Sequence, residues 1–279
     1  MPELPEVQAH AERLDETFTG RVFDRLQLLK FTALKTAVPA PETAAGHRLT
    51  SVDRRGKYLL LHVEPVVFAV HLMQGGRLVP DAKMSAKPRN GQARFVFDDR
   101  PALLLTESGT ERRAGVWALD AAHATTTPPL DTLGPEADRI EPAALLDRLH
   151  AKNQRVHGFL RDQRSIAGLG RRLANEVCHR AGISPFAMTG RFTADGAEHL
   201  VEAIRAVVAE GLADERGRTD MSASKDRPAA VHARTGEACP VCGDTVRAVE
   251  YSGYTVNYCA TCQTGGKVLA DNTTSRFLR

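Results

Sequence analysis

The spacing of hydrophobic residues changes twice along this chain. Behind the opening MPELP, the apolar residues Val7, Ala11, Leu14 and Phe18 recur every three or four positions, which predicts a helix over residues 6–18 that stops at Gly20. From residue 21 to about residue 119 the pattern becomes short apolar or alternating runs, such as YLLLHV, ARFVF and GVWAL. Such runs, separated by Gly, Pro, Asp and Arg, predict an antiparallel β-sandwich or barrel.

A proline-rich stretch separates the strand-rich part from a helical part. The segment AAHATTTPPLDTLGPEADRIEP holds four prolines and few apolar residues, as connecting segments do. The helical period returns beyond it, for example in RRLANEVCHRAG and ADGAEHLVEAIRAVVAEGL. We therefore expect an α+β multidomain protein with an N-terminal β-sandwich and leading helix (1–122), a linker (123–140), a helical domain (141–228), a cysteine-rich hairpin (229–263) and a mobile tail (264–279).

Composition limits the class of protein. A chain of 279 residues can build two domains that each bury a hydrophobic core. It has no apolar run long enough for a membrane span and no apolar segment behind a basic start, so we expect a cytoplasmic protein. The net charge of +3 permits a polyanionic partner without requiring one. Local groups of cations, such as RRGK at 54–57 and GRR at 170–172, fit either such a partner or an ordinary solvated surface.

Four of the five cysteines lie in one short window. Cys239, Cys242, Cys259 and Cys262 form two C-x2-C pairs separated by sixteen residues, a spacing typical of a zinc ribbon. Between the pairs, TVRAVEYSGYTVNYC alternates around SG, which predicts a β-hairpin. Four thiolates leave no coordination site for water, so the window predicts one structural Zn²⁺ ion, with two disulfides as the rival interpretation. Cys178, alone on a helix, is interpreted as a small core residue.

The N-terminus carries a chemical possibility of its own. Removal of Met1 would leave Pro2 with a free secondary amine, which is a nucleophile. The alternative is structural, because proline is favoured in the first turn of a helix and carboxylates such as Glu3 and Glu6 are stabilised at a helix N-terminus.

Four segments in the same order resemble the formamidopyrimidine-DNA glycosylase and endonuclease VIII family: MPELPEV, RRGKYLLLHV, FLRDQRSIAGLGRRLANEVCHRAGISP and the finger GEACPVCG to YCATCQ. The resemblance extends from residue 1 to about residue 263. It implies an N-terminal β-sandwich, a helix-two-turn-helix domain and a C-terminal zinc finger, with damaged DNA bound in the cleft between the two halves. It also implies an enzyme of base excision repair that removes damaged bases and cuts the strand at abasic sites.

The resemblance implies roles for particular residues. Pro2 corresponds to the nucleophile that attacks C1′ of the damaged nucleotide and forms an iminium intermediate. Glu3 corresponds to the acid and base near the sugar, Glu6 to a supporting carboxylate, and Lys57 to a hairpin lysine that meets phosphate. Gly168 and Gly170 lie in the turn where the backbone approaches a phosphate at the start of the next helix, which a helix N-terminus favours. Glu176 matches a glutamate on that helix.

The DNA-contacting positions depart from the family pattern. Arg171 stands where the family has a phosphate-binding asparagine, and Tyr254 stands where its finger hairpin has an arginine. Among the residues that fill the space left by an extruded base, Gln74 replaces a methionine and Ala114 replaces a phenylalanine, whereas Arg112 matches. Tyrosine cannot neutralise a phosphate, and base extrusion costs a few kcal/mol that such fillers partly offset.

These departures leave three hypotheses. The leading one is a bifunctional DNA glycosylase and abasic-site lyase, expected as a bacterial, nucleoid-associated monomer. The second is a damaged-DNA-binding protein with little glycosylase activity, since phosphate contacts and the aromatic filler have changed. The third is a lyase for single-stranded, bubble or crosslinked DNA, which requires less base extrusion.

Overall fold

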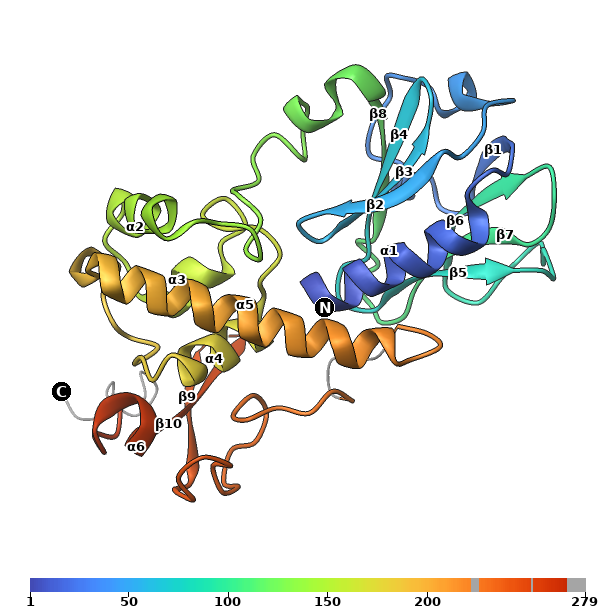
Figure 1. The fold of residues 1–279 in the computed structure, drawn as a ribbon. Helices are drawn as coiled ribbons and strands as arrows, with labels where there is room; N and C mark the ends of the chain where they lie inside the picture. The colour runs from blue at the N-terminus through green and yellow to red at the C-terminus, as the bar shows by residue number, and fades with distance from the viewer. Residues whose placement is uncertain (222–225, 252, 270–279) are drawn as a thin grey trace. The chain divides into compact units, whose positions relative to one another are not determined.

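The computed structural model describes residues 1–221, 226–251 and 253–269, and the chain in it divides into two units (Figure 1). Unit 1 contains residues 1–132 and 219–221. Unit 2 contains residues 133–218 and the described part of 222–279. No helix in the described ranges has the length and apolar character needed to cross a membrane.

Unit 1 is an antiparallel β-sandwich preceded by helix α1 (Leu4–Phe18). One sheet has the strand order β2-β3-β4-β8 and the other has the order β1-β6-β7-β5. This confirms the predicted N-terminal sandwich. The strands are β1 (Phe23–Leu28), β2 (Ser51–Arg55), β3 (Tyr58–Val63), β4 (Val66–His71), β5 (Gly76–Asp81), β6 (Gly91–Phe97), β7 (Ala102–Glu107) and β8 (Gly115–Asp120), with short 3-10 helices at Phe31–Ala33, Pro41–Ala44 and Ala121–Thr126.

Helix α1 begins two residues before the predicted start at residue 6. Glu3 is its N-cap and forms a capping box with Glu6, and Pro5 lies in the first turn, where its missing N–H group costs nothing. The periodic pattern could not show this, because the cap and the proline precede the first apolar repeat.

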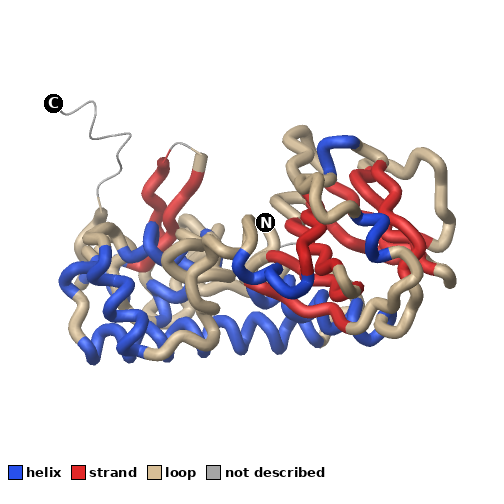
Figure 2. The backbone as a smooth tube through the Cα atoms, turned by 90° about the horizontal axis from the view of Figure 1, so that it is seen from above, coloured by secondary structure: helices blue, strands red, loops and turns tan. Residues whose placement is uncertain are grey.

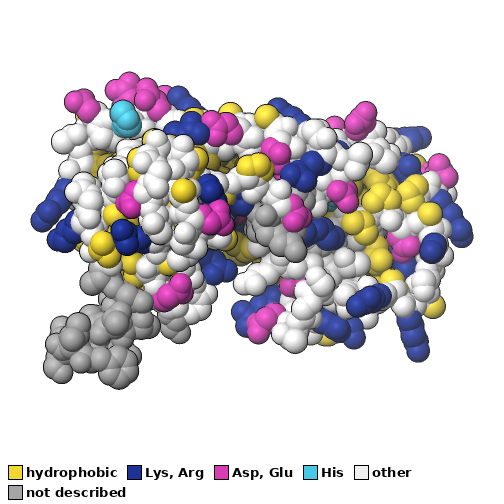
Figure 3. Space-filling view, turned by 90° about the horizontal axis from the view of Figure 1, so that it is seen from below, with side chains coloured by type: hydrophobic (Ala, Val, Ile, Leu, Met, Phe, Trp, Pro, Cys, Tyr) yellow, Lys and Arg dark blue, Asp and Glu magenta, His cyan; other side chains and the backbone are white. Residues whose placement is uncertain are grey.

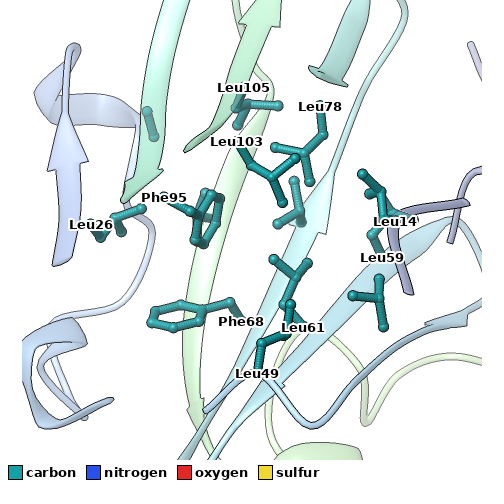
Figure 4. Close-up of a cluster of buried hydrophobic side chains, with 14 of the residues drawn as sticks. Leu14, Leu26, Leu49, Leu59, Leu61, Phe68, Leu78, Phe95, Leu103 and Leu105 are labelled. Atoms are coloured by element: carbon teal, nitrogen blue, oxygen red, sulfur yellow. The ribbon is translucent and has the colours of Figure 1, made fainter. Parts of the chain in front are cut away.

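The core of unit 1 lies between the two sheets and under α1. Leucine side chains from several strands surround the rings of Phe68 on β4 and Phe95 on β6, which meet edge to face at a centroid distance of 5.4 Å (Figure 4). Leu14 brings the apolar stripe of α1 to the same cluster. The stripe that predicted the helix is therefore the face that docks it onto the sandwich.

Unit 2 combines helices with a C-terminal hairpin. The helices are α2 (Pro142–Ala151), α3 (Val156–Arg161), α4 (Arg171–Arg180), α5 (Ala194–Arg216) and α6 (Ala260–Thr264), with a 3-10 turn at Thr189–Arg191. Strands β9 (Val246–Tyr251) and β10 (Tyr254–Cys259) pair antiparallel, as predicted, with Tyr251 opposite Tyr254 beside the turn (Figure 2). Helix α4 packs against α3, α5 and β10, so the finger hairpin and the helices share one unit.

The second half of the expected linker is hydrogen-bonded and partly buried in unit 2. Gly134 N–H donates to the Gln163 carbonyl at 2.8 Å, and Ala137 N–H donates to the Ala167 carbonyl at 3.1 Å. Ala137 and Ile140 are buried. These two apolar residues and the backbone pairing hold the segment from residue 133 onward in unit 2.

The expected mobile tail is partly described. Thr264 ends α6, and Leu269 N–H donates to the Tyr258 hydroxyl at 2.8 Å, so residues 264–269 lie against the hairpin. The remainder of that expectation, residues 270–279, lies outside the described residues.

Candidate active site and nucleic-acid interface

The predicted catalytic carboxylates lie at the beginning of α1. Backbone N–H of Glu3 donates to Oε2 of Glu6 at 2.9 Å, and the Glu3 side chain accepts from the Glu6 backbone in return. Glu6 is fully buried, Glu3 is 4% exposed, and Pro2 is buried beside them. The reciprocal bonds fix both carboxylates relative to the chain terminus.

Two bonds between α1 and β2 show which end of the sheet this helix start faces. The Arg54 Nε donates to Oε1 of Gln8 at 2.8 Å, while Val52 N–H donates to Oδ1 of Asp15 at 2.7 Å. Helix α1 and strand β2 therefore run in opposite directions, so the start of α1 lies near the end of β2 and the β2–β3 turn. That turn consists of Gly56, with φ of +57°, and Lys57.

Lys57 is 4% exposed and lies close to His71, the last residue of β4. Burial chiefly, and then the nearby Lys57 charge, lower the pKa of His71 to about 4. The neutral ring accepts at Nδ1 from Met73 N–H at 3.1 Å. It meets the Tyr58 ring edge to face at 4.7 Å. A neutral histidine thus stands beside the buried ammonium, and no sequence motif indicated it.

The loops with Gln74 and Arg112 meet at the same end of the sheet. Ser108, from the β7–β8 connection, donates N–H and Oγ–H to the Gly75 carbonyl, both at 3.2 Å. A Cβ on Gly75 would lie 2.3 Å from the Ser108 carbonyl oxygen, so this close approach requires glycine. Gln74 and Arg112 are both exposed.

Ala114 is buried and cannot fill the space left by an extruded base. It is 1% exposed, and its N–H donates to Oε2 of the buried Glu107 at 2.6 Å. In unit 1 the structure therefore gathers six predicted residues at one end of the β2-β3-β4-β8 sheet, with the Ala114 side chain withdrawn into the protein. The six are Pro2, Glu3, Glu6, Lys57, Gln74 and Arg112.

In unit 2, the glycine turn leads directly into α4. Gly168, with φ of +101°, precedes Gly170, the N-cap of α4, and Arg171 is the first helical residue. The Gln163 amide braces the turn, because its Oε1 accepts from Gly168 N–H at 3.0 Å and its Nε2 donates to the Leu169 carbonyl at 2.7 Å. Arg171 donates from Nη1 to the Gly253 carbonyl, 3.1 Å away in the hairpin turn.

Glu176 holds the segment that precedes the finger. Its two carboxylate oxygens accept from the consecutive backbone N–H groups of Ala230, Val231 and His232 at 2.7 to 3.0 Å. The matched glutamate on α4 therefore binds backbone, and we assign it a structural part in this unit.

The four window cysteines converge. Their Sγ atoms all lie within 4.8 Å of one another, and none forms a disulfide. Tetrahedral zinc bound at about 2.3 Å needs ligand sulfurs about 3.8 Å apart, and the Cys239–Cys262 and Cys242–Cys259 sulfur pairs lie 3.9 Å and 3.4 Å apart. The donor set and spacing therefore fit one zinc ion, and the cluster disagrees with the rival interpretation of two disulfides.

The electrostatics of the cluster favour a thiolate at Cys239. Burial opposes its ionisation, but N–H groups of Cys242 and Val241 and the His179 ring outweigh burial and lower the pKa of Cys239 to about 6. Nε2 of His179 lies 3.3 Å from its Sγ. Cys178 is the opposite case, because full burial raises its pKa to about 12 and leaves an inert core thiol, as the sequence suggested.

Comparison with known proteins agrees with this architecture. Residues 1–117 match the formamidopyrimidine-DNA glycosylase N-terminal domain, and residues 132–223 match the H2TH domain of the same enzymes. The chain is 33% identical over 276 residues to a formamidopyrimidine-DNA glycosylase of Methylococcus capsulatus, with 94% of this chain and 100% of the relative covered. It therefore belongs to the formamidopyrimidine-DNA glycosylase family.

Two solved structures have the same fold. MutM (Fpg) from Thermus thermophilus superimposes with a TM-score of 0.80 at 26% identity, covering 96% of this chain and all of that one. Lactococcus lactis formamidopyrimidine-DNA glycosylase, non-covalently bound to DNA containing an AP site, superimposes with a TM-score of 0.83 at 19% identity, covering 94% of this chain and 99% of that one. Both bear out the fold class predicted from the sequence.

Proposed function

We propose that this protein is a bifunctional DNA glycosylase and abasic-site lyase of base excision repair. The observation that carries the proposal is the start of α1, where a buried proline precedes two buried carboxylates locked in a capping box. Family membership supplies the substrate class, since the similar proteins are named formamidopyrimidine-DNA glycosylases.

Removal of Met1 during maturation frees the Pro2 amine, and the reaction begins with this amine. Its nitrogen lone pair forms a bond to C1′, and the bond from C1′ to the damaged base breaks. The base leaves with that electron pair and takes up the proton that the Pro2 nitrogen loses. Glu3 then donates a proton to the sugar ring oxygen, so that the ring opens and a cationic iminium remains on Pro2. Splitting the reaction through a covalent intermediate lowers the barrier of each step.

The iminium then acts as an electron sink. Loss of a C2′ proton to a carboxylate expels the 3′ phosphate, and loss of the C4′ proton in a second elimination expels the 5′ phosphate. Glu6 holds Glu3 in place through the backbone bond at 2.9 Å. We assign Lys57, which lies near His71, the contact with a phosphate at this site.

Residues of unit 2 bind the phosphates of the DNA backbone. Gly170 and Arg171 offer free N–H groups and a cation at the start of α4, which is an arrangement that binds phosphate. Tyr254 lies on the hairpin end beside them. One zinc ion, held by Cys239, Cys242, Cys259 and Cys262, would supply structural cross-linking of the hairpin and no chemistry.

A second candidate function rests on Ala114. Because its side chain is 1% exposed, this residue cannot enter a base stack, and the chain has no aromatic filler at that position. Extruding a base from intact duplex would therefore be less well compensated. This favours a lyase that acts on single-stranded, bubble or otherwise unpaired DNA as the alternative.

Borohydride trapping tests both enzyme proposals. Mature protein with a free Pro2 amine, incubated with abasic-site DNA, should give a covalent adduct that peptide mapping places on Pro2. Pro2→Gly should reduce trapping sharply while DNA binding stays nearly intact, and Glu3→Gln should slow base release more than binding. Lys57→Ala is the matched control for a rival Schiff base on a lysine.

A failure to trap abasic DNA would contradict both enzyme proposals. If the mature protein binds abasic DNA tightly but traps none, both enzyme proposals fail and a damaged-DNA-binding protein remains. A panel of oxidised purines, oxidised pyrimidines and abasic sites, in single and double strands, then separates glycosylase from lyase action.

We further propose that the protein acts as a monomer on the bacterial nucleoid. A single chain carries both the start of α1 and the finger hairpin, so each copy holds a full set of the proposed residues. Light scattering of the protein with and without a short duplex should give one chain per DNA. A second chain per duplex would contradict this.

A further inference from the structure

Tyr254 carries a cation from another element. The guanidinium carbon of Arg161, the last residue of α3, lies 4.0 Å from the centroid of the Tyr254 ring. The ring itself is held by its cross-strand neighbour Tyr251, which stacks on it at 4.7 Å with the planes 7° apart. A stacked guanidinium keeps its plane and its charge, so the contact positions Arg161 without neutralising it.

In the described part of the chain, the N–H groups of this guanidinium have no protein acceptor. Within residues 1–221, 226–251 and 253–269, the Arg161 side chain makes neither a hydrogen bond nor an ion pair. The carboxylate next in sequence is already engaged, since Oδ1 of Asp162 accepts from Arg164 N–H at 3.0 Å and Oδ2 accepts from Ser165 Oγ at 3.1 Å. An arginine has five N–H donors suited to a planar oxyanion.

Two further arginines contact the same end of the hairpin. Arg171 donates to the Gly253 carbonyl at 3.1 Å. Arg155 donates to the Tyr251 hydroxyl, and its guanidinium carbon lies 4.3 Å from the Phe186 ring centroid. No carboxylate in the described chain pairs with Arg155, Arg161 or Arg171. Three cations, two from the ends of α3 and one from the start of α4, therefore contact one end of the hairpin.

Figure 3 shows how the charged side chains are distributed on one face of the molecule. On the face of the molecule shown in Figure 3, Lys and Arg side chains lie in separate groups with Asp and Glu between them, and no broad basic surface is seen. Because the net charge is only +3, we expect individually positioned cations to contribute more to phosphate binding than the overall charge does.

We propose that Arg161, positioned by the Tyr254 ring, binds a phosphodiester of the DNA backbone. The inference rests on the proposed DNA-directed function and names a residue that the sequence motifs did not indicate. It also assigns a role to Tyr254. The tyrosine ring cannot neutralise a phosphate, but it positions Arg161, which can.

The test is the salt dependence of binding by full-length, zinc-loaded protein. The probe is a fluorescent duplex with a tetrahydrofuran abasic analogue, titrated over a series of salt concentrations. Arg161→Ala should weaken binding and reduce the slope of log Kd against log salt by about one unit, as loss of one phosphate contact does. Arg164→Ala is the matched control, since it removes the same charge from an exposed arginine for which no aromatic contact exists in the described chain.

A double-mutant cycle tests the positioning by Tyr254. Tyr254→Phe keeps the ring and should bind as the wild type does, whereas Tyr254→Leu should weaken binding. Adding Tyr254→Leu to Arg161→Ala should cost little more than Arg161→Ala alone, because the ring acts through the arginine. Circular dichroism and zinc content should match the wild type in each variant.

Each result decides the proposal. Equal slopes for Arg161→Ala, Arg164→Ala and the wild type would overturn it, as would an additive cycle for the part played by Tyr254. Wild-type protein that does not bind the duplex would overturn it together with the proposed function. A reduced slope with no trapping at Pro2 would support the phosphate contact while the enzyme proposals fail.

Discussion

Nε2 of His179 on α4 lies 3.3 Å from Sγ of Cys239 at the start of the finger. Both groups are buried, with His179 7% exposed and Cys239 3% exposed. With its proton on Nε2, the ring donates to the thiolate and helps to lower its pKa. The helical part of unit 2 thereby stabilises the charged form of a residue that the finger needs for metal binding.

His179→Phe should weaken zinc binding by about tenfold, because the ring shape remains while the donor to the thiolate is lost. Competition against a chromophoric chelator measures the affinity. His199→Phe, on the exposed side of α5, is the control and should leave zinc affinity unchanged. Equal affinities in both variants would show that the contact does not assist the metal.

Cys259→Ser should lower the zinc content and disorder the β9–β10 hairpin, while the unit 1 sandwich remains folded. Cys178→Ser, the same substitution outside the cluster, should retain one zinc ion per chain. Metal analysis together with hydrogen exchange of the two units checks both statements. Less than half an equivalent of zinc in wild-type protein purified without chelator would count against the metal site itself.

Arg171→Ala should weaken DNA binding across all sequences and reduce the salt slope by roughly one unit. In the described structure the Arg171 side chain makes one hydrogen bond, to the Gly253 carbonyl, so its remaining donors are available to phosphate. Salt titration with unrelated duplexes checks the result. An unchanged slope would mean that the backbone N–H groups at the start of α4 bind the phosphate alone.

Acid should destabilise both units between about pH 6.5 and pH 4. Burial lowers the pKa of His10 to about 4 in unit 1 and that of His157 to about 3 in unit 2, so each ring is neutral when folded but takes up a proton on unfolding. The unfolded chain therefore binds more protons in this range, and stability rises with pH through it. At pH 5 each histidine should cost its unit about 2 kcal/mol relative to pH 7.

Urea unfolding at several pH values, followed separately for the two units, measures this cost. His10→Gln should reduce the pH dependence of unit 1 by about half, because burial also lowers the pKa of His71 in that unit to about 4, and His157→Gln should reduce the pH dependence of unit 2. His199→Gln is the control, since its ring is exposed in the folded protein. If the His10 and His157 variants keep the full wild-type pH dependence, other groups are responsible.

The sequence predicted the features that are written in local patterns. Alternating runs predicted the strands of the sandwich, the alternation around SG predicted the hairpin, and the two C-x2-C pairs predicted the convergence of the four cysteines. It could not predict contacts between residues far apart in the chain. His179 and Cys239 are separated by sixty positions, and the pairing of Arg161 with Tyr254 depends on how α3 packs beside the hairpin.

The departures at Ala114 and Tyr254 show the same limit. Residue identity alone indicated that an aromatic filler and a cation were missing. Only the fold shows that Ala114 is turned inward and that Tyr254 holds a guanidinium on its ring. The effect of each departure from the family pattern depends on the side chains packed around it in the fold, and a sequence motif does not contain that information.

The grip of Glu176 on three consecutive backbone N–H groups has a consequence for engineering chimeras. Arg172 and Asn175 on the same helix also reach this segment, through the Arg227 carbonyl at 2.6 Å and the His232 ring at 2.9 Å. A finger grafted from a relative would arrive without a matching helix to seat it. Successful recombination should therefore place the crossover before α4, so that the helix and the finger are inherited together.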